Sequence, residues 1–493
     1  MKIVRYQKLL LILLISLLCP LSAGNLFADD GPALPKGLGG AMEPESSDGP
    51  PGLPAGLGSL NSNDEGPSLP AGLGSAESTG STGVKEEPSS YSWPDITGFM
   101  EIRSGFRLQN DPYEKDPSVG EIRLQLEMDK QWKKFLFEFT GDIYYDLLAD
   151  DRSVSIEKGK GFLDLREMSV SFSAFDFMDI KAGRQILTWG TGDLVFINDL
   201  FPKDWQSFLI GRDTEYLKAP SDAVKLSIFT NPVNIDLVYT PKFDSDRYIT
   251  GERLSYWNGF RVAGMDSIIQ PIRPDNWIDN DEWAVRFSKN ISGNEFAFYG
   301  YRGYWKSPGG VDTLTFRNIF PELSVYGFSV RGQVGKGIGN IESGYYDSRD
   351  DSTGSNPFIN NSQIRFLAGY EQDLPRLASD LTLGIQYYLE HMMDHDEYLS
   401  TLPAGAAAAD EDRHLFTVRI TKLYLNQNLT CSLFTYYSPS DDDLYIRPNI
   451  SYKISDNFKT EVGANLFTGE YPHTFFGQFR DNTNMYIAVR YYY

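Results

Sequence analysis

The sequence predicts an all-β protein: a transmembrane antiparallel up-and-down β-barrel of about 18 strands (16–18), preceded by a disordered N-terminal tether. Three observations lead to this class. Apolar residues recur at every second position over most of residues 93–493, as in strands whose two faces meet different surroundings. The connections between these strand candidates alternate between short and long. The last strand, NMYIAVRYYY, is followed by no turn, so it is either an exposed edge or the partner of the first strand.

Residues 1–28 have the features of a secretory signal peptide. Lys2, Arg5 and Lys8 precede the apolar run LLLILLISLL, and Ala28 closes a tolerable cleavage site. The run is too short to span a membrane. A lipoprotein signal at Cys19 is the less favoured alternative, because Leu and Pro flank that cysteine poorly. We therefore expect an exported mature chain.

Composition excludes several classes of protein. The chain has 67 Asp+Glu against 45 Lys+Arg, a net charge of −22, and removal of the signal makes it about −25. This balance argues against a nucleic-acid-binding surface. Cys431 would have no partner after the signal is removed, so no disulfide framework is expected. No later apolar stretch reaches the ~18 residues of a transmembrane helix, whereas 29 Tyr and 31 Phe fit an outer-membrane barrel.

Residues 29–92 form a low-complexity linker rich in Pro and Gly. It contains three imperfect copies of one phrase, GPALPKGLG, GPPGLPAGLG and GPSLPAGLG. Such a segment cannot bury enough apolar surface to offset its ordering entropy. We expect a flexible periplasmic tether. The alternative is that each repeat docks a periplasmic partner, since repetition raises effective concentration; deletion of residues 29–90 distinguishes the two.

The alternation gives each strand candidate one apolar and one polar face. Near the start of the barrel, Ile102 and Phe106 share one parity, and Glu101, Arg103 and Arg107 share the other. A soluble sandwich would bury the apolar face, whereas a membrane barrel turns it to lipid and lines a wet lumen with the polar face. Alternation alone does not separate these folds, but loop lengths do.

Eighteen strand candidates are centred near residues 102, 125, 139, 169, 182, 227, 237, 286, 299, 328, 342, 368, 386, 418, 432, 449, 462 and 489. Connections after even-numbered strands are short. The intervening ones are mostly long, at about 147–162, 189–221, 244–280, 305–321, 347–362, 391–412 and 469–483. Outer-membrane barrels show this asymmetry, with tight periplasmic turns and long outer loops. An even strand number places the linker and the C-terminus in the periplasm.

The final strand is expected to close the barrel against the first. Its alternate residues form a lipid-facing row: Met485, Ile487, Val489, Tyr491 and Tyr493. The row resembles the C-terminal signal by which outer-membrane barrels are recognised, which implies that the barrel-assembly machinery is a partner. Outer-membrane lipids are the other expected surroundings.

One internal segment carries a family resemblance. Gly183-Arg184-Gln185, Trp189-Gly190, an Asn-Asp-Leu-Phe-Pro run and later Leu217-Lys218-Ala219-Pro220 resemble Gram-negative outer-membrane channels with a G-R-Q-x-x-x-W-G motif, including alginate-export-type porins. The resemblance covers about forty residues closely and implies that the loop 191–221 folds inward and narrows the pore. Members of this group move anionic polymers or small apolar molecules, so the solute stays open.

Charged residues at inward parity are the candidate pore-lining set. They are Arg103, Arg107, Arg123, Lys181, Arg184, Gln185, Trp189, Arg490, Glu127 and Asp142. A lumen lined with one sign of charge would attract ions of the opposite sign, so one interpretation of the arginines is a cationic track for anions. The favoured interpretation is that they pair with inward carboxylates such as Glu101 and Glu138 and make the lumen rigid, for which Arg–carboxylate geometry is well suited.

No catalytic, cofactor or metal site is expected. His391 and His395 belong to a strand end and a long loop, not to a helix on which i and i+4 would converge. The acidic clusters at 150–151, 350–351 and 441–443 are better explained as solvated loop tips than as calcium sites.

These observations predict an outer-membrane channel for passive passage of small solutes, anionic or apolar, and no enzyme. Barrels of 16–18 strands leave an aqueous path. The alternative is a barrel that works as a surface enzyme or binding protein, or as a sheath for a periplasmic export or electron-transfer partner.

Overall fold

The computed structural model describes residues 95–493; the expected signal peptide (1–28) and linker (29–92) lie outside the described residues. Eighteen strands form one antiparallel sheet. They are β1 (Ile96–Arg107), β2 (Pro117–Trp132), β3 (Phe135–Asp146), β4 (Leu163–Phe175), β5 (Met178–Ile186), β6 (Pro220–Phe229), β7 (Asn234–Thr240), β10 (Glu282–Ile291), β11 (Asn294–Tyr304), β14 (Glu322–Val334), β15 (Gly337–Ser348), β16 (Gln363–Asp373), β17 (Leu381–Met392), β18 (Asp412–Tyr424), β19 (Leu429–Ser438), β20 (Asp443–Lys453), β21 (Phe458–Gly469) and β22 (Asn484–Tyr492).

The sheet closes on itself between its first and last strands. β1 pairs with β2 on one side and with β22 on the other, so Ile102 lies opposite both Ile122 and Val489. The predicted barrel class is confirmed, and each of the eighteen predicted strand centres lies inside an observed strand. Closure removes the exposed sheet edge that the last strand would otherwise present.

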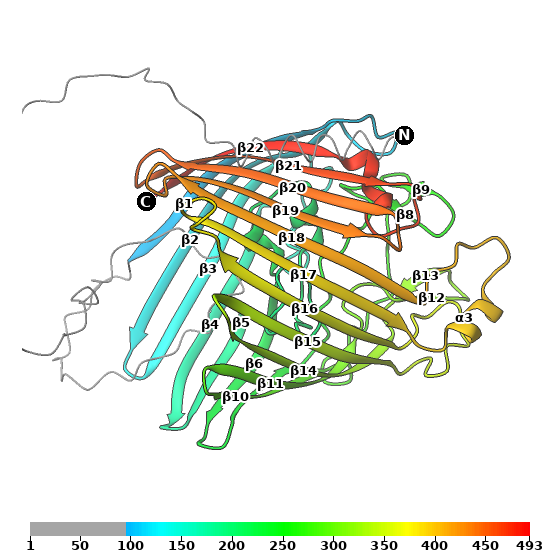
Figure 1. Cartoon of the computed structure of the whole chain (residues 1–493), viewed down its shortest axis with the longest axis horizontal. Coiled ribbons are helices and arrows are strands. Elements are labelled where there is room, and N and C mark those ends of the chain that lie inside the picture. The colour runs from blue at the N-terminus through cyan, green and yellow to red at the C-terminus, as the bar shows by residue number, and fades with distance from the viewer. Residues whose placement is uncertain (1–94) are drawn as a thin grey trace, which may run out of the picture. The chain divides into compact units, whose positions relative to one another are not determined.

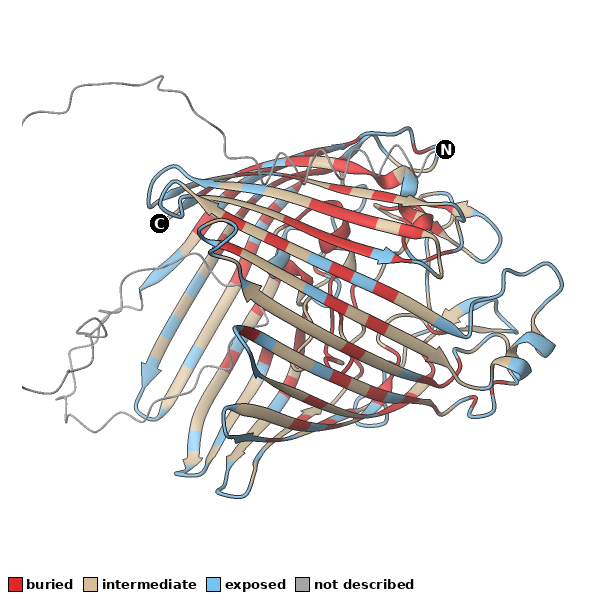
Figure 2. Ribbon diagram, viewed as in Figure 1, coloured by how far each residue is buried: buried red, intermediate tan, exposed pale blue. Residues whose placement is uncertain are grey.

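The two faces of the barrel are the reverse of those of a soluble protein. On the outer face the apolar Ile102 side chain is 57% exposed, whereas its inward neighbour Arg103 is 2% exposed. Buried and exposed residues alternate along the strands (Figure 2). This arrangement rules out a sandwich with an apolar core and fits a membrane barrel with a polar lining.

Short turns gather at one end of the barrel together with the C-terminus, and the long loops gather at the other (Figure 1). The loops hold the hairpins β8 (Tyr256–Trp257)–β9 (Val262–Ala263) and β12 (Gly310–Asp312)–β13 (Arg317–Ile319), and the short helices α2 (Trp205–Ile210), η1 (Thr214–Leu217), α3 (His395–Thr401) and η2 (Gly477–Asn482). None of the helices between residues 95 and 493 has the length and apolar character needed to cross a membrane.

The main apolar cluster lies inside the barrel. It joins residues of the β5–β6 connection, among them Ile197, Phe208 and Leu209, to inward side chains of distant strands such as Tyr346 and Tyr445. We call this connection, residues 187–219, the strap. Its bounds differ from the expected 191–221 because β5 ends at Ile186 and β6 begins at Pro220.

Candidate functional site

The strap has a defined local structure. Gly190 has a φ of +83°, a left-handed conformation that favours glycine, and a Cβ there would lie 2.9 Å from a Glu342 carboxylate oxygen. Asp204 caps α2 by accepting a hydrogen bond from the Ser207 N–H at 2.7 Å. Gly211, with a φ of +92°, ends the helix. These turns let the strap enter and leave the lumen.

The first half of the strap lies against β15–β19. The Glu342 carboxylate on β15 accepts hydrogen bonds from the N–H groups of Thr191 (2.8 Å) and Asn198 (2.7 Å). Asp193 and Arg419 on β18 form a two-point ion pair, at 2.5 and 2.6 Å. This half is therefore tied to the wall by charged groups.

Neutral contacts extend the same attachment. Gln386 on β17 accepts from the Asp193 N–H (2.7 Å) and donates to the Asp193 carbonyl (2.8 Å). The hydroxyls of Tyr346 and Tyr436 donate to the carbonyls of Ile197 (2.5 Å) and Leu194 (2.9 Å). The backbone polar groups of the strap thus find partners inside the barrel, as buried groups require.

The second half of the strap lies against the wall around β22, β1 and β2. Arg103 donates to the Gly211 carbonyl at 2.7 Å, and Arg212 pairs with Glu121 on β2. Asp213 lies 3.2 Å from Arg490 on β22. The strap consequently crosses the lumen, from its root on β5 and β6 to β15–β19 and back to the seam between β22 and β1.

Tyr216 of the strap is held between two guanidinium groups. Arg123 and Arg166 each lie 4.4 Å from the centre of its ring, and Gln125 donates to its hydroxyl at 3.2 Å. A cation over an aromatic face is stabilising, more so away from water. The arginines of this wall therefore also serve to pack the strap.

The connection between β7 and β10 braces the strap. Asp246 accepts from the Lys203 N–H (2.8 Å) and the Trp205 indole N–H (3.1 Å). Arg247 pairs with Asp164 on β4 (2.7 Å) and Asp204 (3.3 Å). A second loop thus fixes the strap from the long-loop side.

Most candidate arginines lie inside the barrel with carboxylate partners. Arg103 and Arg490 each lie 2.9 Å from Glu101, and Arg123 lies 2.5 Å from Asp142. Their contacts agree with the pairing interpretation more than with an unobstructed cationic track. The fourth, Arg107, donates to the backbone carbonyls of Pro117 and Arg253.

The other candidates occupy different parts of the lumen. Lys181 pairs with Glu138 at 2.8 Å. Gln185 is buried and donates to the Ala223 carbonyl of β6 at 2.9 Å. Trp189 packs in the strap against Phe201, with ring centres 4.9 Å apart. Glu127 stands at inward parity on β2, opposite Thr97 and Thr140, and is exposed.

Arg184 is placed differently from the expectation. Its register partners are Met168, which is 60% exposed on the outer face, and Asp222, with which it pairs at 2.7 Å. Asp222 lies two residues before the exposed Val224 and therefore on the same, outer face of β6. Arg184 stands three residues from the inward Lys181, and odd spacing along a strand reverses the face. It therefore belongs to the outer rim and not to the lumen.

The C-terminal row lies on the outer face. Ile487, Val489, Tyr491 and Tyr493 are exposed and Met485 is partly so. Tyr493 donates its hydroxyl to the Gln125 carbonyl of β2 at 2.8 Å. The described geometry does not bear on the role of this row in assembly, which stays a prediction.

The histidines of the long-loop end do not converge. His391 is hydrogen-bonded to Asp412 (2.8 Å), whereas His395 contacts the Ala409 carbonyl (2.9 Å). Within residues 95–493 no group of three or more His, Cys, Asp or Glu side chains is arranged to hold a metal ion.

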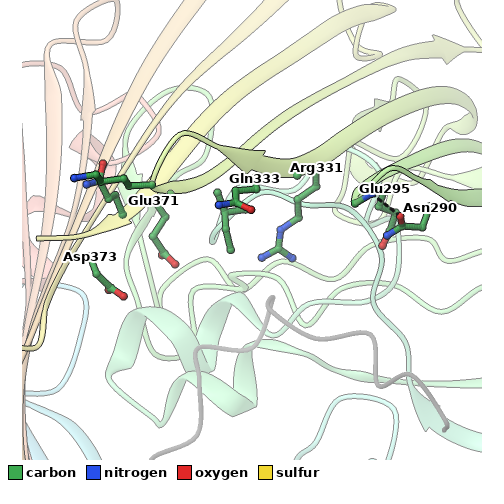
Figure 3. A pocket seen from close by; sticks show the side chains of 12 residues that line it. Asn290, Glu295, Arg331, Gln333, Glu371 and Asp373 are labelled. Atoms are coloured by element: carbon green, nitrogen blue, oxygen red, sulfur yellow. Dashed lines mark hydrogen bonds between the residues drawn. The ribbon is translucent and has the colours of Figure 1, made fainter. Parts of the chain in front are cut away.

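A cavity of about 550 Å³ opens at the short-turn end. Its lining carries three carboxylates and two cations: Glu295, Glu371, Asp373, Arg331 and Lys336. Figure 3 shows Arg331, Glu371 and Asp373 projecting to the same side of the wall. Charged side chains of both signs thus line a chamber at the short-turn end of the barrel.

Two strap carboxyls titrate differently. Burial raises the pKa of Glu215 to about 7, helped by the neighbouring Asp213 and opposed by Arg490. Burial alone would also raise the pKa of Asp213, but Arg490 and Lys459 hold it well below its usual range. Of these two neighbouring carboxyls, the pKa of Asp213 is lowered and that of Glu215 is raised.

Glu342, Asp193 and Arg419 were not among the sequence candidates. Their contacts join positions about 150 to 230 residues apart, and no local period signals such a pairing. One usable sign existed for Glu342: it is a lone inward carboxylate between the small residues Gly339 and Gly344.

No protein-family profile matches the chain, and no curated protein matches it in sequence. Solved structures similar to it include Pseudomonas aeruginosa OccD3 (OpdP), at 8% identity over 81% of this chain and 91% of that chain, with a TM-score of 0.44. Acinetobacter baumannii OccAB4 is 10% identical over 83% and 100%, with a TM-score of 0.49. A mutant of Rh. blastica porin is 11% identical over 81% and 100%, with a TM-score of 0.35.

Proposed function

We propose that this protein is a porin-like channel of an outer membrane and that small solutes cross it passively. The observation that carries this proposal is a closed ring of 18 strands with an apolar outer face, a charged inner face and one ordered loop across its lumen. Barrels of this size leave an aqueous path, and an inward loop would set its narrowest part. The proposed role is transport and not catalysis.

The proposed orientation follows from the loops. Outer-membrane barrels place short turns in the periplasm and long loops outside. The short-turn end would then face the periplasm, and the linker and the C-terminus would lie there. The charged chamber at that end would be the periplasmic mouth of the channel.

We propose that the solutes are small and hydrophilic and that selection by charge is weak. Support comes from the inward arginines, whose charges are largely matched by carboxylates such as Glu101 and Asp142. The resemblance of the 183–190 segment suggests anionic or apolar solutes instead. The sign of the reversal potential under a salt gradient distinguishes anion preference, cation preference and near-neutral behaviour.

The test is planar-bilayer conductance of the refolded mature protein, compared with a variant whose residues 190–217 are replaced by a short Gly-Ser linker. We expect discrete open steps for the wild type and larger steps for the variant. Equal conductance of the two would show that the strap is not the constriction. No conductance from either folded protein would refute the channel itself.

A further inference from the structure

Glu342 is a buried carboxylate whose partners are all neutral groups of the strap. Its residue is 1% exposed, on the inner face of β15. One oxygen accepts from the Thr191 N–H (2.8 Å), the Thr191 hydroxyl (3.0 Å) and the Gly192 N–H (3.2 Å). The other accepts from the N–H (2.7 Å) and the side-chain amide (3.0 Å) of Asn198.

These five donors come from both ends of one short segment, residues 190–198, which we call the strap tip. A single carboxylate therefore closes the tip into a ring against the wall. Backbone N–H groups that converge in this way form an anion-binding nest, and hydrogen bonds to an ionised acceptor are roughly twice as strong as neutral ones.

The wall is shaped to receive the tip. A Cβ on Gly327 of β14 would lie 1.6 Å from the side-chain oxygen of Asn198, and one on Gly344 of β15 would lie 2.9 Å from Ile197. The Asn198 amide also donates to the Ser343 carbonyl at 3.1 Å. Glycines on adjacent strands thus leave a slot that the Asn198 side chain fills, next to the carboxylate.

The stability of the docked strap tip depends on the negative charge of the Glu342 carboxylate. Without the carboxylate, four donors in a buried place (the Thr191 N–H and hydroxyl, the Gly192 N–H and the Asn198 N–H) would lose their acceptor, and the Asn198 side-chain amide would keep only the Ser343 carbonyl. Unmet hydrogen bonds of this kind are unfavourable. The other attachments of the tip, through Asp193 and the Tyr346 and Tyr436 hydroxyls, would remain. Loss of the carboxylate should therefore loosen the tip without unfolding the barrel.

We propose that Glu342 is a latch: its negative charge holds the strap tip against the wall, and removal of that charge releases the tip into the lumen. The effect on solute flow rests on the proposed channel function, whereas the attachment itself does not. Glu342 is a positioning residue in this scheme, because it acts through the strap.

The first test compares Glu342→Gln with Glu390→Gln in the full-length refolded protein. Glu390 is also an inward carboxylate, but its bonds go to Arg365 and Tyr388 of the wall, so the control removes the same charge without touching the strap. Amide hydrogen exchange of peptides covering residues 190–198 should become at least tenfold faster in Glu342→Gln and stay unchanged in Glu390→Gln. Exchange in the strands should stay slow in both.

A second variant, Glu342→Ala, leaves the nest empty. Sodium formate at tens of millimolar should restore slow exchange in the tip, because formate supplies a carboxylate of the right size, whereas equal sodium chloride or neutral formamide should not. Rescue of this kind would not follow from a merely structural role of the Glu342 side chain.

The proposal is overturned if tip exchange is unchanged in both Glu342 variants, if it rises equally in Glu390→Gln, or if formate has no effect. If the latch holds, single-channel recordings of Glu342→Gln should show larger or noisier open steps than the wild type. A wild type that does not conduct would remove the channel function, while the exchange and rescue data would still decide the latch.

Discussion

Asp193 and Arg419 form a two-point ion pair that joins the strap to β18, although 226 residues separate them. The Arg419 guanidinium also lies over the Phe434 ring, 4.7 Å from its centre. Together with Gln386, which binds both backbone groups of Asp193, this pair is an attachment of the tip separate from Glu342. The two attachments can be tested independently.

Replacing Arg419 with Gln should moderately weaken the attachment of the strap tip to the barrel wall. The Asp193 side chain is about one-third exposed, so solvent screens the pair and we expect a local loss of about 1 kcal/mol. Exchange of residues 190–198 should rise several-fold, and the difference from wild type should shrink in 1 M salt. Lys453→Gln, which breaks the exposed pair with Asp456, is the control. A salt-independent effect would show that the Phe434 contact dominates instead.

Replacing Gly327 with Ala should displace Asn198 from its slot. The added methyl would overlap the Asn198 side chain, and forced overpacking of this kind costs about 1–3 kcal/mol. Gly384→Ala is the matched control, because the nearest atom to a Cβ there lies 3.5 Å away. Thermal unfolding followed by heat-modified gel mobility should show a lower midpoint for Gly327→Ala alone. Equal midpoints would mean that Asn198 moves aside freely.

Strand positions could be predicted from the sequence because a period of two is a local signal that closure does not alter. Arg184 stands three positions after Lys181, so the same rule would have placed it on the face opposite Lys181. The strap contacts are different in kind. Glu342 and Thr191 are in contact only because the closed barrel brings β15 opposite the start of the strap. No local sequence pattern predicts a contact between residues so far apart in the chain. Burial of the inward arginines was likewise invisible, because it depends on what the strap covers.

The strap should be less firmly held in alkaline solution. Glu215 has a folded-state pKa of about 7, raised by burial and then by Asp213 above its ordinary value of 4.5. A neutral Glu215 carboxyl therefore stabilises the folded strap fully below about pH 4.5, and this contribution is lost as the pH rises through 7. Because 43% of the Glu215 side chain is exposed, solvent screens its interactions and the loss of stability should be small.

Hydrogen exchange of residues 211–218, corrected for the intrinsic pH dependence, should thus show weaker protection at pH 8 than at pH 6. Glu215→Gln keeps a neutral side chain and should remove the difference. A pH effect that persists in Glu215→Gln would assign it to another group. Asp213→Asn serves as the opposite control, since it removes the partner that disfavours ionisation and should lower the pH at which Glu215 titrates.

Removal of Tyr493 should impair closure of the barrel. Its backbone N–H donates to the Gly98 carbonyl of β1 at 3.2 Å, and its hydroxyl donates to the Gln125 carbonyl of β2 at 2.8 Å. If the seam lies in a membrane, a carbonyl left without a donor is unfavourable because no water replaces it.

We expect a chain lacking Tyr493 to give a smaller fraction of folded, heat-modifiable barrel, in vivo and on refolding into lipid vesicles. Tyr493→Phe keeps the aromatic ring and the backbone bond to Gly98 but removes the donor to the Gln125 carbonyl, so its folded fraction should lie between those of the wild type and of the chain lacking Tyr493. A normal yield without Tyr493 would contradict its role at the seam, and a defect seen in vivo but not in vesicles would assign that role to recognition by the assembly machinery.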